Sequence, residues 1–135
     1  MILDTNAISA LLEDDEGLHA RIAAEPALYL PVIAIGEFRF GLLGSRLRET
    51  LEEKLAALIR RGVVLDVTEA TTRHYAELRQ ALKLAGTPIP ANDLWIAALA
   101  RQHAFRVLTR DAHFDHVAGI ERVGGNGGKD ETFTC

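Results

Sequence analysis

The sequence has 135 residues and a net charge of −4, with 48% hydrophobic and 25% charged residues, which are ordinary values for one globular domain. The acidic balance argues against binding to nucleic acid through overall positive potential, and a single cysteine, Cys135, excludes disulfides and cysteine metal clusters within the chain. No apolar stretch reaches the roughly 18 residues of a membrane span, and the first residues lack a basic region and a cleavage site, so we expect a cytoplasmic protein without membrane contact.

An unbroken apolar run, Met1–Leu3, leads directly into Asp4, and such a short run is typical of a strand buried on both faces of a parallel sheet. Similar compact runs predict four further strands, at Ala27–Pro31, Val63–Val67, Arg106–Thr109 and Ile120–Val123. Apolar residues at helical spacing predict helices at Ala7–Leu12, Glu16–Glu25, Val32–Leu43, Leu47–Arg61, Glu69–Ala85 and Leu94–His103. The alternation of strands and helices predicts an α/β fold with a parallel sheet of about five strands.

Local signals define several ends of these elements. Gly41 and Gly44 are expected to end the third helix, and Thr68 to cap the fifth. The fourth helix carries an apolar stripe formed by Leu47, Leu51, Leu55, Leu58 and Ile59. After Val123 the sequence becomes glycine-rich and polar, so we expect residues 1–123 to form one domain and residues 124–135 to be a flexible tail.

Four carboxylates share one kind of position along the chain. Asp4 follows the first strand, Glu37 lies in the early turns of the helix after the second, Asp93 opens a helix, and Asp111 follows the fourth strand. Strand carboxyl ends and the starts of the following helices lie along one edge of a parallel sheet, where such sheets bind ligands. We therefore expect the four acids to converge there.

Convergence of these acids has an energetic consequence. Two carboxylates about 6 Å apart repel by roughly 3 kcal/mol at an effective dielectric near 20, and they raise one another's pKa. Arg39 and Arg110, the nearest cations in sequence, are too few to neutralise four acids. A divalent cation is a better answer, and ligands that are all oxygen suit Mg²⁺ or Mn²⁺ rather than zinc.

Less specific explanations exist for single residues. Glu37 or Asp93 alone would complement a helix dipole, and Asp111 alone would be an ordinary turn aspartate. His113 and His116 lie near the fourth acid, where a ligand role is conceivable; because no His-x-x-x-His pair accompanies them, we expect surface histidines of a loop. No nucleophile-elbow serine and no glycine-rich phosphate loop is present in the sequence.

Four segments, taken in order, resemble a known family. They are Met1–Asn6 (Met-Ile-Leu-Asp-Thr-Asn), Leu30–Val32 with Gly36–Gly41, Ile89–Ala98 and Leu108–Phe114. Their order and spacing resemble those of PIN-domain ribonucleases, specifically VapC-type toxins of toxin–antitoxin pairs, and the match extends to about Val123.

The resemblance implies a three-layer α/β/α domain and an endoribonuclease dependent on Mg²⁺ or Mn²⁺ that hydrolyses single-stranded or loop RNA. It also implies inhibition by a cognate antitoxin, and homodimerisation. Its catalytic and metal-binding positions fall on the four acids Asp4, Glu37, Asp93 and Asp111. Its supporting positions fall on Thr5, Asn6 and Thr109, and on Asp115, which either assists the metals or caps a turn; Arg39 and Arg110 are candidates for RNA contacts.

By this resemblance, water would attack the phosphodiester and leave a 5′-phosphate and a 3′-hydroxyl, with a metal ion activating the water. Two alternatives remain. A phosphatase with Asp4 as nucleophile would need a second acid two residues later, where this chain has Asn6. A binding module that keeps the fold and its antitoxin without cutting RNA also remains open.

Overall fold

A computed structural model describes residues 1–124 and the backbone of residues 132–134. The strands in this part of the chain are β1 (Ile2–Leu3), β2 (Tyr29–Pro31), β3 (Val63–Leu65), β4 (Val107–Leu108), β5 (Glu121–Val123) and β6 (Thr132–Thr134). The helices are α1 (Thr5–Leu12), α2 (Glu16–Ala23), α3 (Val32–Leu42), α4 (Arg48–Arg61), α5 (Glu69–Leu84), α6 (Ala91–His103) and the 3₁₀ helix η1 (Ala112–His116).

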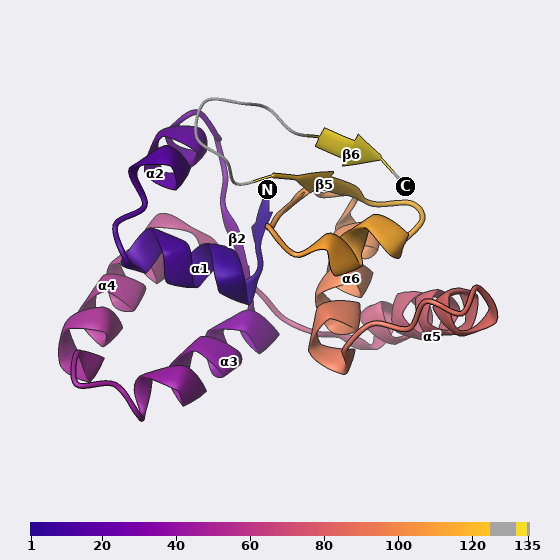
Figure 1. The fold of residues 1–135 in the computed structure, drawn as a ribbon, viewed down its shortest axis with the longest axis horizontal. Coiled ribbons are helices and arrows are strands. Elements are labelled where there is room, and N and C mark those ends of the chain that lie inside the picture. The colour runs from indigo at the N-terminus through magenta and orange to yellow at the C-terminus, as the bar shows by residue number, and fades with distance from the viewer. Residues whose placement is uncertain (125–131, 135) are drawn as a thin grey trace.

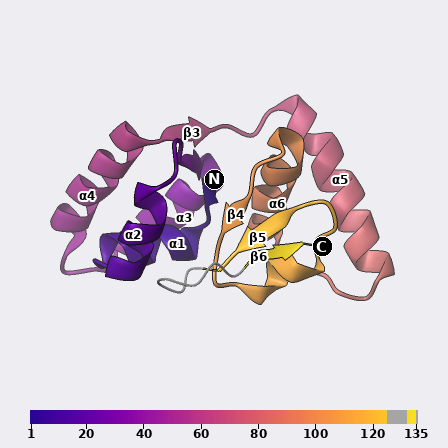
Figure 2. The ribbon, with the colours of Figure 1, turned by 90° about the horizontal axis from the view of Figure 1, so that it is seen from above.

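The sheet has the strand order β3-β2-β1-β4-β5-β6. The five strands β1 to β5 run parallel, which confirms the predicted α/β fold, and β6 pairs antiparallel with β5 at the edge. Helices α1 to α4 gather on one side of the molecule and α5 and α6 on the other (Figures 1 and 2). The protein is thus a three-layer α/β/α domain.

The strand order reverses direction between β1 and β4, which lie side by side at the centre of the sheet. In their register Ile2 lies opposite Val107 and Leu3 opposite Leu108. The residues that follow, Asp4 and Thr109, therefore emerge next to each other at the carboxyl edge. Open α/β sheets bind ligands at such a switch point.

The apolar runs of the strands form the centre of the core, as predicted. Ile2, Leu3, Leu30 and Leu108 have no exposed surface, because helices cover both faces of the sheet. The predicted apolar stripe of α4 is buried at Leu55 and Leu58 and half-buried at Leu51 and Ile59. Leu47 differs, with 63% of its surface exposed, because α4 begins only at Arg48 and Leu47 lies in the preceding turn.

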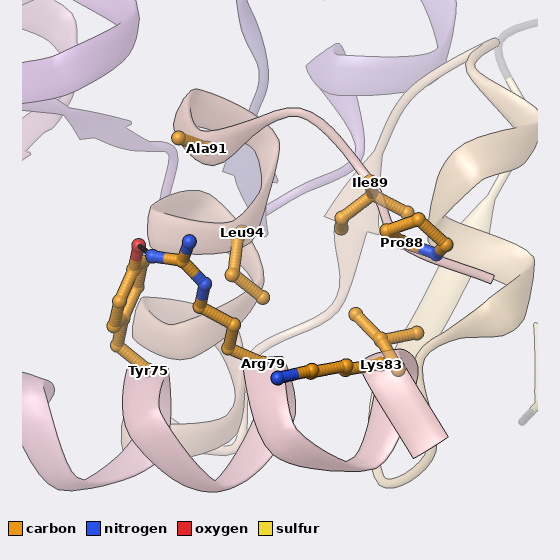
Figure 3. A pocket seen from close by; sticks show the side chains of 8 residues that line it. Tyr75, Arg79, Lys83, Pro88, Ile89, Ala91 and Leu94 are labelled. Atoms are coloured by element: carbon orange, nitrogen blue, oxygen red, sulfur yellow. Dashed lines mark hydrogen bonds between the residues drawn. The ribbon is translucent and has the colours of Figure 1, made fainter. Parts of the chain in front are cut away.

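The end of α5 fixes how the chain returns to α6. Gly86 has a φ of +72°, and its N–H donates to the carbonyl of Lys83 while the N–H of Thr87 donates to the carbonyl of Leu82. This is a Schellman motif, in which glycine suits the left-handed position. A cavity lies between α5, the following link and the start of α6 (Figure 3). From the Gly86 turn the chain returns along α5 to the first turn of α6, which carries Asp93.

Two predictions concern the ends of elements and of the chain. Helix α3 ends at Leu42, between the two glycines expected to end it. Of the tail expected to be flexible, residues 125–131 and Cys135 lie outside the described residues, and Thr132–Thr134 form β6. Within the described part of the chain, no helix is long and apolar enough to cross a membrane.

Candidate metal centre

Asp4 lies at the centre of the carboxyl edge, directly after β1, where it caps α1. Its carboxylate accepts a hydrogen bond from the backbone N–H of Ala7 at 2.8 Å through Oδ1 and one from the hydroxyl of Thr109 through Oδ2. Only 2% of Asp4 is exposed. Both carboxylate oxygens are thus held in place by Thr109, directly after β4, and by Ala7 on α1, which fixes the orientation of the side chain at the base of the site.

Burial raises the pKa of Asp4 from its usual 3.8 to about 6. The hydrogen bonds from Thr109 and Ala7 act in the opposite direction, because they stabilise the charged form. The negative charges of Asp93 and Asp111 raise this pKa further. Asp4 is therefore a carboxylate whose ionised form is destabilised at neutral pH unless a cation lies beside it.

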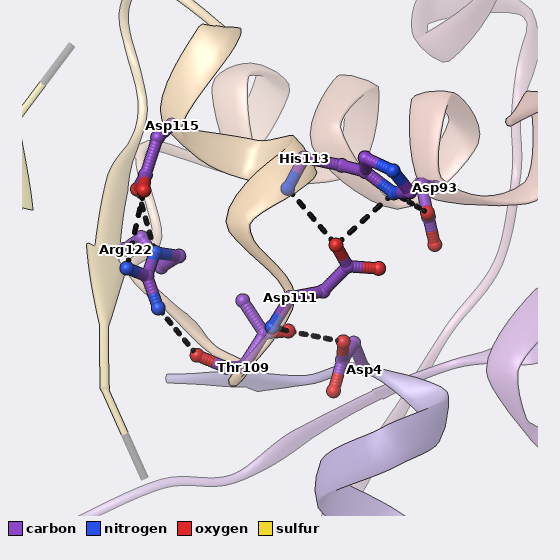
Figure 4. Close-up of polar contacts among 7 residues, drawn as sticks. All are labelled: Asp4, Asp93, Thr109, Asp111, His113, Asp115 and Arg122. Carbon is purple, nitrogen blue, oxygen red and sulfur yellow. Dashed lines mark hydrogen bonds and ion pairs between the residues drawn. The ribbon is translucent and has the colours of Figure 1, made fainter. Parts of the chain in front are cut away.

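Asp93, Asp111 and His113 form a compact group beside Asp4 (Figure 4), with one potential ligand atom of each within 4.8 Å of the others. The Nδ1 atom of His113 lies 3.0 Å from Oδ1 of Asp111 and 3.4 Å from Oδ2 of Asp93. Asp93 comes from the first turn of α6, and Asp111 caps η1 after β4. The fold therefore brings together residues that are distant in sequence.

The pKa of Asp93 is also raised, first by burial and then by the charge of Asp111. The contact with His113 lowers this pKa, and the charge of Glu37 raises it. Glu37, on α3, accepts a hydrogen bond from the hydroxyl of Thr5 at 2.9 Å. Glu37 is thus near enough to Asp93 to affect its protonation, and Thr5 orients the Glu37 carboxylate.

Thr109 connects the acids to the loop that follows β4. Its hydroxyl donates to Asp4 and accepts from the backbone N–H of Asp111 at 2.9 Å. Its carbonyl accepts from the buried guanidinium of Arg122 at 3.0 Å. The other nitrogens of Arg122 bind both carboxylate oxygens of Asp115, at 2.6 Å and 3.2 Å. Asp115 thus braces η1 against β5, on the side of the loop away from Asp93 (Figure 4).

The remaining candidates lie around this group. Arg39 binds Glu52 at 2.7 Å, and Arg110 binds Asp15. Both guanidinium groups are about half exposed. The side chain of Asn6 is exposed next to Thr5. The two arginines nearest to the acids in sequence are therefore engaged with other carboxylates.

The sequence interpretation missed two residues of the site. His113 was expected to be a surface histidine, but its imidazole lies against two acids even though half of it is exposed. Arg122 was not singled out at all, although it is the buried partner of Asp115 and Thr109. Only the position of His113, two residues after Asp111, hinted at its role.

The donor set fits a hard divalent cation. Carboxylate groups of Asp4, Asp93 and Asp111 lie at one edge of the sheet, and the charge of Glu37 acts on Asp93. Carboxylate oxygens suit Mg²⁺ and Mn²⁺. Burial is the main reason that the pKa values of Asp4 and Asp93 are raised, and the charges of neighbouring acids add to it; a bound cation would stabilise the ionised carboxylates against both effects.

A sequence profile of the PIN domain matches residues 1–120. The chain is 38% identical to the VapC ribonuclease Y4jK of Sinorhizobium fredii, covering 91% of this chain and 95% of that relative. It is 34% identical to the toxin FitB of Neisseria gonorrhoeae, covering 82% of this chain and 87% of that protein.

Solved structures show the same architecture. The structure of FitAcB from Neisseria gonorrhoeae is similar with a TM-score of 0.77 and 31% identity, covering 85% of this chain and 91% of that one. The DNA-bound VapBC from Salmonella typhimurium has a TM-score of 0.85 over 92% of this chain and 96% of that one; at 24% identity, this likeness concerns the fold alone.

Proposed function

The chain belongs to the PIN-domain family, as a relative of VapC-type ribonucleases, and on this premise we propose that it is the endoribonuclease toxin of a toxin–antitoxin pair, dependent on Mg²⁺ or Mn²⁺. The observation that carries the proposal is the convergence of Asp4, Asp93 and Asp111 at the switch point of the sheet, with Glu37 coupled to them. A site of this composition suits the chemistry of a charged phosphodiester once a cation is bound.

In this proposal Asp4, Asp93 and Asp111 would hold the ion, and Glu37 would either bind a second ion or accept the proton of the attacking water. When bound, the ion would offset the negative charge that develops on the phosphate and make water a stronger nucleophile. Thr109 and the N–H of Ala7 fix the orientation of Asp4 through their hydrogen bonds.

Water attacks the phosphorus, the bond to the 3′-oxygen breaks, and that oxygen takes a proton, which leaves a 5′-phosphate and a 3′-hydroxyl. Thr5 keeps the carboxylate of Glu37 in place beside this reaction. Arg39 and Arg110 are half exposed, so they are available to RNA phosphates if they exchange Glu52 and Asp15 for them.

A protein partner is part of the proposal. Solved structures similar to this chain include VapBC pairs and a toxin–antitoxin complex from Klebsiella pneumoniae. At the end of α3 and in the turn before α4 this chain exposes 80% of Phe40, 68% of Leu43 and 63% of Leu47. Exposed apolar side chains gathered in one place are typical of a surface that another protein covers. We propose a cognate antitoxin as partner, a homodimer as the assembly, and the cytoplasm as the place of action.

The test is cleavage of total cellular RNA and of a single-stranded oligonucleotide with Mg²⁺, with the cut ends mapped. We expect Asp4→Asn and Asp93→Asn to lower the rate at least ~100-fold, because each removes a charged group needed in the transition state. Asp66→Asn, at an exposed position outside the site, is the matched control and should retain the wild-type rate.

Addition of EDTA should abolish the cleavage, and the antitoxin should still bind both variants. Equal cleavage by wild type and Asp93→Asn, or equal cleavage with EDTA, would refute the metal-dependent mechanism. A wild-type protein that binds its antitoxin but never cuts RNA would favour the alternative of a non-catalytic binding module.

A further inference from the structure

A cavity of about 260 Å³ lies between α5 and the start of α6, with the link between the two helices closing one side (Figure 3). Ile89 from the link and the buried Leu94 from α6 supply apolar walls. Tyr75, Arg79 and Lys83 line it from α5. The volume lies just below the roughly 300 Å³ at which pockets begin to hold drug-sized ligands, so it suits one small flat group.

Two cations lie at this cavity without an acidic partner. Arg79 and Lys83 are exposed and one helical turn apart on α5, and neither pairs with a carboxylate among the residues that the structure describes. Arg79 instead donates to the hydroxyl of Tyr75 at 2.8 Å. The Tyr75 ring in turn stacks on Trp95, with ring centroids 3.9 Å apart. The guanidinium is therefore held in position while its charge remains uncompensated.

The apolar cavity distinguishes these two cations from others on the surface. Among the described residues, Arg60 and Arg73 are also exposed without an ion pair to a carboxylate, but neither lines an apolar cavity, and Arg101 on α6 pairs with Glu77 on α5. Unpaired cations over an apolar wall suit a ligand that combines an anionic group with a flat apolar ring. A nucleotide has this composition, because its base presents an apolar face and its phosphate a negative charge.

The cavity and the acids share the first turn of α6. Ala91 lines the cavity, and Asp93 follows two residues later. With about 3.6 residues per turn and a rise of about 1.5 Å per residue, these two residues are about 3 Å apart along the axis of α6 and face nearly opposite sides of the helix. An RNA strand whose phosphate lies at Asp93 would therefore reach the cavity by passing around the start of α6.

We propose that this cavity binds one unpaired nucleotide of the RNA that flanks the bond to be cut, with the base against Ile89 and Leu94 and neighbouring phosphates at Arg79 and Lys83. The proposal rests on the proposed ribonuclease function, since it assigns a substrate subsite to that same reaction. It makes single-stranded RNA the preferred substrate, because a base within a duplex cannot enter the cavity.

The test measures binding of a fluorescein-labelled single-stranded RNA oligonucleotide by fluorescence anisotropy, in EDTA and at several salt concentrations. For single strands, each lost phosphate contact lowers the magnitude of the slope of log affinity against log salt by about 0.7, so Arg79→Ala with Lys83→Ala should lower it by about 1.4. By the same relation, the RNA affinity of this double variant at 0.1 M salt should be about 25-fold lower than that of wild type.

A matched double variant, Arg60→Ala with Arg73→Ala, removes the same charge at exposed positions that do not line the cavity, and should bind RNA as wild type does. Ala91→Phe fills the cavity without changing the charge, so it should weaken binding and leave the salt slope unchanged. Circular dichroism establishes that each variant is folded.

The outcomes separate this inference from the proposed function, because the binding assay needs neither metal nor cleavage. If Arg79→Ala with Lys83→Ala binds RNA like the matched control, or if wild type binds no RNA, the subsite is refuted, whether or not the enzyme cuts RNA. Loss of antitoxin binding with unchanged RNA binding would assign the cavity to a protein partner and refute it too. If Arg79→Ala with Lys83→Ala loses RNA binding while the wild-type protein binds RNA but never cuts it, the result would support the subsite and refute the ribonuclease function.

Discussion

Asp4→Asn should remove the part of the pH dependence of stability that comes from the buried Asp4 carboxyl group in the metal-free protein. The carboxyl group is almost completely buried, and its pKa rises to about 6 from the usual 3.8. Asparagine keeps an oxygen that accepts the hydrogen bond from the N–H of Ala7, so the cap of α1 remains. The substitution thus removes the charge with little change in shape.

The sign follows from the proton balance. The raised pKa means that the folded state binds a proton more tightly than the unfolded chain, so the free energy of unfolding falls as pH rises from the unfolded pKa through the folded one. The pKa shift of about 2 units corresponds to roughly 3 kcal/mol, most of which is lost by about pH 6 and the remainder about one pH unit higher. For a chain of 135 residues, this amounts to roughly 10 °C in melting temperature.

The assay is urea unfolding followed by circular dichroism, in EDTA, at several pH values between about 4 and 7.5. Wild type should lose roughly 3 kcal/mol more than Asp4→Asn across this range. Asp66→Asn, at an exposed position between β3 and α5, should keep the wild-type slope. A wild-type stability that stays constant or increases with pH, or that has the same slope as Asp4→Asn, would refute the conclusion that burial opposes ionisation of Asp4.

Two further predictions concern the scaffold of the site. Arg122→Met leaves the carboxylate of Asp115 and the carbonyl of Thr109 without the guanidinium, so the free energy of unfolding should fall by about 2–3 kcal/mol. Arg122→Lys keeps the charge, so its free energy of unfolding should lie between those of Arg122→Met and wild type. Gly62→Ala would place a Cβ 2.9 Å from the backbone oxygen of Leu28, and should lower the free energy of unfolding by about 1–3 kcal/mol. Gly44→Ala is the control, because nothing lies near its Cβ position, and it should keep a stability close to wild type. Equal melting temperatures of the two variants would show that the chain around Gly62 and Leu28 adjusts without strain.

The sequence predicted the fold because its main signals are local. The apolar run before Asp4 belongs to a strand that helices cover on both faces, so the absence of alternation was itself informative. The proximity of Asp4, Asp93 and Asp111 followed from a general property of parallel sheets rather than from side-chain detail. Leu47 was assigned to the wrong environment because the apolar spacing continues one residue beyond the start of α4.

The partners of the acids were not predictable in the same way. Whether His113 contacts Asp93 depends on how far η1 lies from the start of α6, which is determined by tertiary packing rather than by spacing in the chain. The same holds for Arg122, whose position on β5 opposite the loop after β4 depends on strand order. Charged side chains choose among several partners of similar energy, and a sequence pattern does not rank them.

The buried acid Asp4 follows a strand that is itself completely buried. Ile2 and Leu3 precede Asp4, Val107 and Leu108 precede Thr109, and all four apolar side chains are completely buried. Burial of each contributes about 1.5–3 kcal/mol, which together exceeds the roughly 3 kcal/mol by which ionised Asp4 destabilises the fold. These short strands therefore hold Asp4 and Thr109 in place whether or not a cation is present. Because the acids are fixed and cannot move apart, a bound cation would relieve their repulsion, and the free energy recovered would strengthen its binding. On the proposed function, the site would then be arranged before the ion binds.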